Sequence, residues 1–294
     1  MKVTCEHTIN NFSKDNAPIM SVTTPMTMVI ETKDCYSNML RSPETRGERV
    51  PSELINPATG PIYIEGAEPG DTLKVTIEKI DIEDFGVVSC GDDCGPLAPF
   101  INGNHLEIVE VKDGFADFLG KYKVPLHKMI GVIGVAPENE SVPCGTPGRH
   151  GGNMDNTKIA KGATLYLPVF HDGAYFGCGD VHACMGDGEI MVSGVEIGAT
   201  VTVKVEVIKG VSIENPRLED DTHIYTIASN EDLEKAIYTA TKDMCSILMK
   251  HLGYTLNEAG MLLSACGNLQ FCQVVDPERT VRMAIPKTIC KEVL

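Results

Sequence analysis

The sequence predicts a mainly β protein, with a sandwich- or barrel-like body followed by a C-terminal α+β unit. Three segments share one pattern, in which a turn precedes residues that alternate between apolar and polar; they span 69–80, 161–169 and 198–208. This alternation has the period of a half-buried strand, and its repetition is typical of a β-sandwich or barrel. After Gly210 the composition shifts, and apolar residues recur at helical spacing.

These patterns indicate three structural parts. Residues 1–60 and 150–215 are expected to form a β-sandwich part that carries the candidate site. Residues 61–149 are expected to form a β-barrel-like part, and residues 216–294 the α+β part. A chain of 294 residues is long enough for one large or two modest domains and for a sizeable core.

Within the body, the segments alternate between strands and polar connections. Many β-branched residues in 21–32 predict short strands, whereas the polar segment 35–56 predicts a loop. Residues 130–137 are apolar without alternation, which predicts a strand buried on both faces. A turn-rich stretch then leads to Gly151, so that a rigid strand would deliver a polar loop.

The C-terminal part contains two helix signals and one strand pair. Apolar residues at helical spacing predict a helix over 233–248, and 229–232 resembles a capping box in front of it. Residues 255–258 form a full capping box for a second, shorter helix. Residues 269–285 alternate as two strands around a turn at 276–279.

Composition excludes several classes of function. The net charge is −16, with 41 acidic against 25 basic residues, and nucleic-acid binding needs the opposite balance. No apolar run approaches the roughly 20 residues of a membrane span. The first residues lack the apolar core of a signal peptide, so we expect a cytoplasmic protein, whose eleven cysteines would be reduced.

The residues that indicate chemistry lie between 151 and 189. The front of this stretch reads Gly151-Gly152-Asn153-Met154-Asp155-Asn156, and residues 177–189 hold four glycines, three carboxylates and one histidine. Glycine permits tight turns and close approach of the backbone to a ligand. Asp, Glu and His bind divalent metals and transfer protons. Apolar residues are interleaved among these polar ones, which indicates a folded and partly buried site.

The same residues resemble the signature of the acetamidase/formamidase family. The resemblance rests on Asn153-Met154-Asp155, Gly179-Asp180-Val181-His182 and Gly186-Asp187-Gly188-Glu189, supported by Pro69-Gly70-Asp71 and the tail 258–264. It implies hydrolysis of a short amide to ammonia and a carboxylate. It also implies that segment 35–56 reaches the neighbourhood of the site, that His105 is a candidate metal ligand, and that the protein is a homo-oligomer, for which we expect a dimer.

Amide hydrolysis requires a nucleophile, stabilisation of an oxyanion and an acid for the leaving amine. We expect a divalent metal to activate water and polarise the carbonyl. The candidate ligands are His105, Asp155, Asp180 and His182. Asp180 and His182 are two residues apart and would share one face of a strand. Glu189 is the expected general base, and Asn153 a donor to the oxyanion or the amide.

Zinc is the expected metal, and calcium is the alternative. Asp187 and Glu189 offer the oxygen ligands that calcium prefers. The same two side chains could instead cap their loop through hydrogen bonds to its backbone.

Two other hypotheses remain open at this stage. In the first, a cysteine attacks the amide; Cys144 is favoured over Cys178 and Cys184, because Arg149 and His150 lie near it and the other two have acidic neighbours. In the second, the chain is a non-enzymatic β-sandwich that binds a metal or a carbohydrate.

Overall fold

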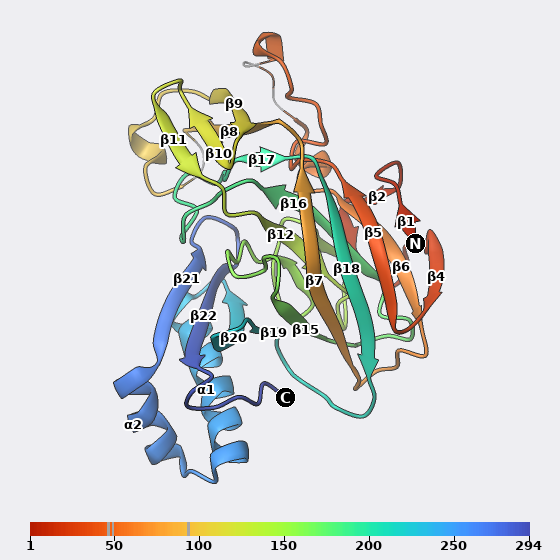
Figure 1. Ribbon diagram of the computed structural model, residues 1–294, viewed down its shortest axis with the longest axis vertical. Helices are drawn as coiled ribbons and strands as arrows, with labels where there is room; N and C mark the ends of the chain where they lie inside the picture. The colour runs from red at the N-terminus through yellow and green to blue at the C-terminus, as the bar shows by residue number, and fades with distance from the viewer. Residues whose placement is uncertain (46–47, 49, 93–94) are drawn as a thin grey trace.

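The computed structural model describes residues 1–45, 48, 50–92 and 95–294. It confirms a mainly β protein with a C-terminal α+β unit. Figure 1 shows helices α1 and α2 gathered at one end of the molecule, beside strands β20–β22, with the β-rich body forming the rest. The predicted loop 35–56 contains residues 46, 47 and 49, which lie outside the described part of the chain.

One sheet runs through the body and into the C-terminal unit. Among the described residues it has nine strands, in the order β1 (Lys2–Val3), β5 (Met26–Thr32), β18 (Ala199–Ile208), β7 (Thr72–Ile82), β15 (Thr164–Pro168), β19 (Arg217–Glu219), β20 (His223–Asn230), β22 (Arg279–Pro286) and β21 (Asn268–Gln273). The three alternating segments of the sequence are strands β7, β15 and β18, and they lie side by side in this sheet (Figure 1). Their apolar residues, such as Val75 and Val203, face the core.

A second sheet carries the candidate site. In the described part of the chain its main path is β11 (Tyr122–Pro125), β10 (Phe115–Phe118), β9 (His105–Lys112), β8 (Phe85–Cys90), β17 (Glu196–Ile197), β16 (Phe176–His182), β12 (Met129–Gly134) and β14 (Gly151–Asn153). Strand β6 (Ala58–Glu65) pairs with β16 and also with β2 (Thr8–Ile9) and β4 (Met20–Thr23). Strands β12 and β16 are buried throughout, as expected of apolar or glycine-rich strands with cover on both faces.

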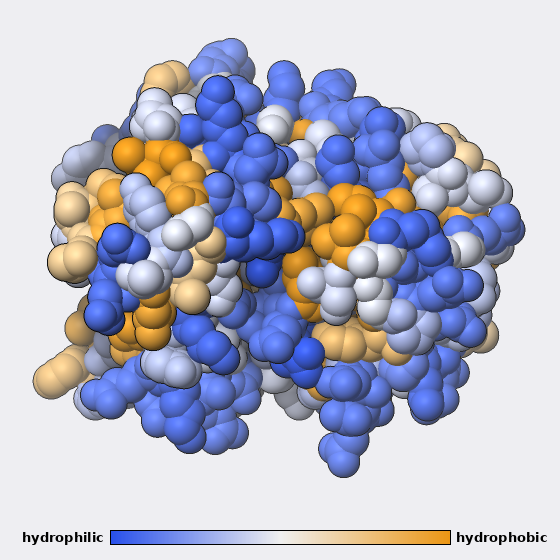
Figure 2. Space-filling model, turned by 90° about the horizontal axis from the view of Figure 1, so that it is seen from below, coloured by the Kyte–Doolittle hydropathy of each residue, from blue (hydrophilic) through white to orange (hydrophobic). Residues whose placement is uncertain are grey.

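The remaining elements are short. Strand β3 (Asn11–Phe12) pairs with β13 (Val142–Pro143). Within the described residues, 3₁₀ turns lie at η1 (Pro43–Thr45), η2 (Ser52–Leu54) and η3 (Ala98–Phe100). The main apolar core lies between the two sheets, since one continuous cluster contains Leu73 and Val203 of the first sheet and Ile130 and Val181 of the second. On the face in Figure 2, hydrophilic residues predominate and hydrophobic ones gather in patches between them.

The C-terminal helices pack on strands β20 and β22 around a second apolar cluster. Helix α1 (Leu233–Leu252) begins after Asp232, whose side chain accepts a hydrogen bond from the Glu234 backbone. The predicted capping box at 229–232 is therefore wrong: Ser229 still belongs to β20, where it pairs with Thr280. Helix α2 (Leu256–Cys266) has the predicted capping box between Thr255 and Glu258.

Strands from the three predicted parts of the chain pair with one another. Strand β7, from the 61–149 part, lies between β18 and β15 of the 150–215 part, and β15 pairs with β19 of the C-terminal part. The division into three parts stays a prediction. Of the helices that the structure describes, none is both long and apolar enough to cross a membrane.

Candidate active site

Strand β12 brings the two halves of the sequence motif together. It pairs with β16, which ends in Asp180 and His182, and with β14, which leads into Asp155. At the centre of β12, Gly131 leaves the space that the carboxylates occupy. A Cβ atom there would lie 2.5 Å from Asp155 Oδ1 and 2.7 Å from Asp180 Oδ2. Glycine at 131 is therefore a packing requirement of the site.

The backbone of the site is strained at three acidic residues. Asp155, Asp180 and Glu189 have φ angles of 42°, 53° and 43°. Positive φ is uncommon for residues other than glycine, and such strain clusters at functional sites. The pairing of β12 with β14 and β16 surrounds Asp155 and Asp180 and holds them in place.

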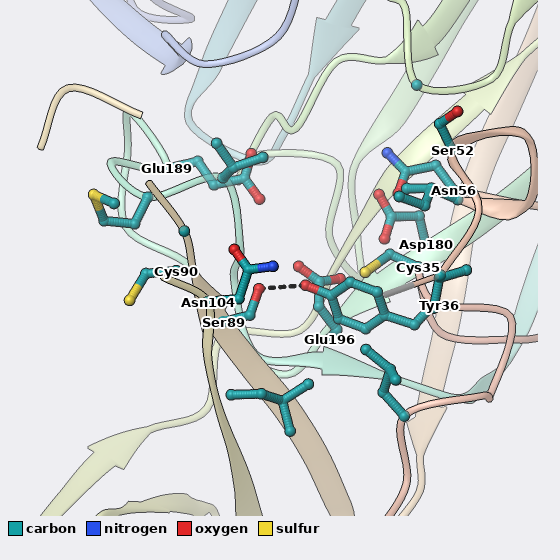
Figure 3. Close-up of a pocket in the computed structure, with 18 of the residues that line it drawn as sticks. Cys35, Tyr36, Ser52, Asn56, Ser89, Cys90, Asn104, Asp180, Glu189 and Glu196 are labelled. Carbon is teal, nitrogen blue, oxygen red and sulfur yellow. Dashed lines mark hydrogen bonds between the residues drawn. The ribbon is translucent and has the colours of Figure 1, made fainter. Parts of the chain in front are cut away.

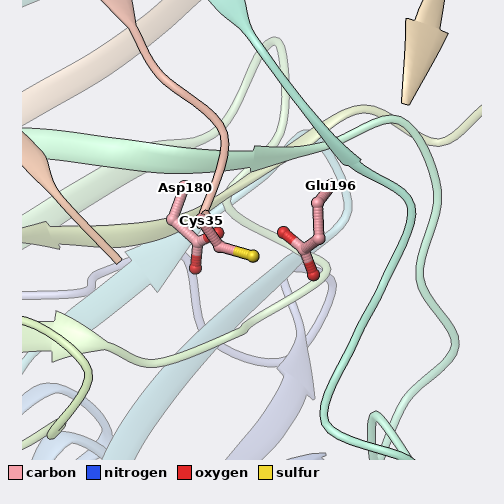
Figure 4. Close-up of side chains that lie close together, drawn as sticks. All are labelled: Cys35, Asp180 and Glu196. Carbon is pink, nitrogen blue, oxygen red and sulfur yellow. The ribbon is translucent and has the colours of Figure 1, made fainter. Parts of the chain in front are cut away.

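His182 is the centre of a buried acidic cluster. Its Nε2 lies 3.0 Å from Glu196 Oε2, 3.4 Å from Asp180 Oδ1 and 3.8 Å from Asp155 Oδ1. Candidate ligand atoms of Asp155, His182 and Glu189 lie within 4.8 Å of one another, and so do those of Cys35, Asp180 and Glu196. Figure 4 shows the Cys35 thiol directed between the Asp180 and Glu196 carboxylates.

The electrostatics of this cluster are unfavourable without a positive partner. Burial and the neighbouring Asp180 raise the pKa of Asp155 well above its ordinary value. Burial likewise raises the pKa of Glu196 to about 7, although His182 opposes the rise. Burial alone would lower the pKa of His182, but the Glu196 and Asp180 carboxylates raise it well above its ordinary value.

Several atoms of the cluster have no hydrogen bond of normal geometry within the described residues. They are both carboxylate oxygens of Asp155, Oδ1 of Asp180, Oε2 of Glu196 and both ring nitrogens of His182. Buried polar atoms are rarely left unpaired in proteins. Carboxylate oxygens and imidazole nitrogens are ligands of divalent cations, so this donor set fits a metal ion.

Glu189 reaches the cluster from a glycine-rich loop that is held by the C-terminal unit. The Gly188 N–H donates to the Cys272 carbonyl at 2.8 Å, and the Val274 N–H donates to the Gly188 carbonyl at 3.2 Å. The Glu189 side chain is buried, and its Oε1 accepts a hydrogen bond from the Gly194 N–H at 3.2 Å. Glu189 is thus fixed next to Asp155 and His182.

Asp187, in the same loop, has a different environment. Its Oδ2 is 2.5 Å from the Arg282 guanidinium, and its Oδ1 accepts a hydrogen bond from the Thr157 hydroxyl. Arg282 is 1 % exposed and also donates to Asn156 Oδ1 at 2.9 Å. Arg282 therefore joins β22 to the loop of Glu189 and to the residue after Asp155.

A cavity of about 530 Å³ opens above the cluster. In Figure 3 the side chains of Asp180, Glu189 and Glu196 surround one space, and Tyr36 meets Ser89 in a 2.5 Å hydrogen bond across it. The described part of segment 35–56 forms a wall of this cavity, as the sequence resemblance implies.

The structure brings together Asp155, Asp180, His182 and Glu189, whereas His105 belongs to neither potential metal group. His105 is exposed on the cavity wall, and its Nε2 lies 3.1 Å from the Asn102 carbonyl. Asn153 also lines the cavity, and its Nδ2 donates to Asp276 Oδ2 at 2.9 Å.

Sequence reasoning missed Cys35, Glu196 and Asp276. Glu196 lies directly opposite His182 in the pairing of β16 with β17, a neighbour that only the strand register reveals. Asp276 stands in a turn that the sequence pattern does predict, but nothing local indicates that this turn reaches the site. The available signal is that Asp276 directly follows the apolar residues Val274 and Val275.

The three cysteines considered as nucleophiles are poorly placed for ionisation. Burial raises the pKa of the Cys144 and Cys178 thiols to about 12 and also raises that of Cys184. A nucleophilic cysteine needs the opposite shift. These environments do not favour a cysteine mechanism.

Comparison with known proteins gives a consistent result. The model of the Acetamidase/Formamidase family matches residues 2–142 and 135–292. The acetamidase of Mycolicibacterium smegmatis is 27% identical over 221 residues, which are 52% of this chain and 53% of that protein. The chain thus spans about half the length of the curated relatives it matches.

Two solved structures resemble the whole chain. A predicted acetamidase/formamidase from Thermoanaerobacter tengcongensis is 44% identical, with a TM-score of 0.96 and coverage of 99% of this chain and 97% of that one. An acetamidase from Bacillus halodurans is 40% identical, with a TM-score of 0.96 and coverage of 100% and 99%.

Replacement of Arg282 tests its role as an anchor. In Arg282→Ala, the buried guanidinium is lost, and we expect the free energy of unfolding to fall by about 3–5 kcal/mol in a guanidinium chloride titration. The matched control is Arg149→Ala, since the Arg149 side chain is 50% exposed and its guanidinium lies beside Glu138. The free energy of unfolding of this control variant should fall by less than about 1 kcal/mol. Similar small losses in both variants would contradict the anchoring role.

Proposed function

Because the chain belongs to the acetamidase/formamidase family, we propose that it hydrolyses the C–N bond of a short aliphatic amide, formamide or acetamide, to ammonia and a carboxylate. The names of the relatives and of the similar structures support this substrate class. The observation that carries the proposal is the buried cluster around His182, which contains carboxylate and imidazole atoms without hydrogen-bond partners among the described residues. Three of its carboxylates, those of Asp180, Glu189 and Glu196, line the cavity.

The proposed cofactor is a divalent cation held by Asp155, Asp180 and His182. Glu196 and Cys35, which lie beside these residues, are further candidate ligands, and His105 is left out of the set. Zinc is favoured by the mixture of imidazole and carboxylate ligands. Calcium, which prefers oxygen alone, is less well supported, because Asp187 is bound to Arg282. When bound, such a cation supplies Lewis acidity, which activates water and polarises the amide carbonyl.

Glu189 is the proposed general base. Its Oε1 is held by the Gly194 N–H, which leaves Oε2 to take a proton from the attacking water. The water oxygen forms a bond to the carbonyl carbon while this proton moves to Glu189. The C–N bond then breaks, and Glu189 returns the proton to the leaving nitrogen, so that the products are ammonia and the carboxylic acid.

The Asn153 side chain has one amide N–H engaged by Asp276. Its assignment as a donor to the oxyanion therefore rests on the second N–H alone. The expectations of a homodimer and of a cytoplasmic location stay predictions.

Ammonia release in the presence and absence of a chelator tests the proposed function. We expect the purified protein to release ammonia from formamide or acetamide, a chelator to lower the rate at least about tenfold, and added zinc to restore it. Iodoacetamide should leave the rate unchanged. Metal binding without turnover would instead favour a binding protein, and loss of activity with iodoacetamide but not with chelator would favour a cysteine enzyme.

Glu189→Gln tests the general base separately from the metal. The amide side chain keeps the volume and can still face Gly194, but it cannot accept the proton from water. We expect kcat to fall by about 10²- to 10⁴-fold, with metal content near that of the wild type. Glu78→Gln, at an exposed position of β7, serves as the control. A Glu189→Gln variant with wild-type kcat would remove Glu189 from the mechanism.

A further inference from the structure

The Asn153 side chain has one paired atom and one unpaired atom. Its Nδ2 donates to Asp276 Oδ2 at 2.9 Å, whereas its Oδ1 is buried and has no hydrogen-bond partner among the residues that the structure describes. Asn153 itself is 3 % exposed and lines the cavity together with Asp276. A buried acceptor of this kind indicates a donor that comes from a ligand.

Asp276 determines which way the Asn153 amide faces. The Asn153 NH₂ group donates to Asp276 Oδ2, so Oδ1 is the amide atom that meets no donor among the described residues. Burial and the neighbouring Glu189 raise the pKa of Asp276, and the hydrogen bond from Asn153 opposes this rise. The hydrogen bond to Asp276 thus holds the Asn153 amide in one orientation, with Nδ2 directed to Asp276 Oδ2.

Asp276 is itself held firmly by buried Gln273. The Val275 and Asp276 N–H groups donate to Gln273 Oε1 at 2.9 and 3.0 Å, and Gln273 Nε2 donates to the Glu278 carbonyl at 2.6 Å. The loop of Glu189 is hydrogen-bonded to this same segment through Gly188. Glu189, Asn153 and Asp276 thus belong to one wall of the cavity.

A primary amide matches this wall. Its nitrogen must lie near Glu189, which protonates it as the C–N bond breaks, and the same nitrogen carries N–H donors. We propose that Asn153 Oδ1 accepts a hydrogen bond from the amide nitrogen of the substrate, and that Asp276 is the positioning residue that presents this acceptor. This inference rests on the proposed amide hydrolysis. It makes the pair a specificity determinant, because an ester of the same acyl group has no N–H and would leave Oδ1 unpaired.

The chain contains a matched pair outside the site. Asn215 Nδ2 donates to Asp243 Oδ2 at 2.9 Å, also in a buried position, where Asp243 belongs to helix α1. The same Asn/Asp exchange can be made at this pair without altering the cavity, because neither residue lines it.

The experiment compares kcat/KM for acetamide and for methyl acetate. We expect Asn153→Leu to lower the value for acetamide about 10- to 100-fold more than the value for methyl acetate, as expected for one lost hydrogen bond. Asn153→Asp alone, which places two carboxylates together, should also lose the preference for the amide. The exchanged double variant N153D/D276N should regain it. In that variant the carboxylate at position 153 can accept from the amide at position 276 through one oxygen and from the substrate through the other. The control N215D/D243N should keep the wild-type ratio.

Each other result overturns the inference in an identifiable way. If Asn153→Leu lowers kcat/KM equally for the amide and the ester, and N153D/D276N does not regain the preference for the amide, Asn153 would be a donor to the oxyanion. Loss of bound metal in Asn153→Leu, measured by elemental analysis, would make Oδ1 a metal ligand. Unchanged selectivity in Asn153→Leu would remove the contact altogether. A wild-type protein inactive on both substrates would overturn the proposed function and this inference with it, whereas the earlier outcomes overturn the inference alone.

Discussion

The burial of like charges around His182 is the constraint on which the rest of the site depends. Asp155, Asp180, Glu189 and Glu196 are each at most 6% exposed, and their carboxylates surround one imidazole. Carboxylates buried without compensation strongly destabilise a folded protein. The fold nevertheless assembles them with unusual local features: a glycine at 131, where any Cβ would strike two carboxylates, and positive φ at three acidic residues. Such an arrangement is explained if a cation completes the site.

The C-terminal α+β unit is part of this site and does more than cover the β body. Strand β22 supplies Arg282, the buried cation that holds Asp187 and Asn156. The segment after β21 pairs with the loop of Glu189 and supplies Asp276. Two sheets and two chain segments far apart in sequence therefore fix the same few side chains, which gives them the rigidity that a preorganised site requires.

The sequence predicted the fold class because local patterns decide it. The alternation in β7, β15 and β18 and the capping box of α2 depend on neighbouring residues alone. The end of β20 shows where prediction from local patterns fails. Residues 229–232 resemble a capping box, but the pairing of Ser229 with Thr280 continues the strand. The site followed the same rule. Asp155, Asp180, His182 and Glu189 stand in a recognisable motif. Cys35, Glu196 and Asp276 reach the site through strand register and tertiary packing, which no local pattern encodes.

The most direct test of this account is the metal content of the purified protein, measured by elemental analysis beside His182→Ala. If the buried carboxylates converge on a cation, the wild type should contain a divalent metal in a fixed ratio to the chain, and the variant should have lost it while remaining folded. A folded wild type that contains no divalent metal, and takes up none when zinc or calcium is supplied, would contradict the account.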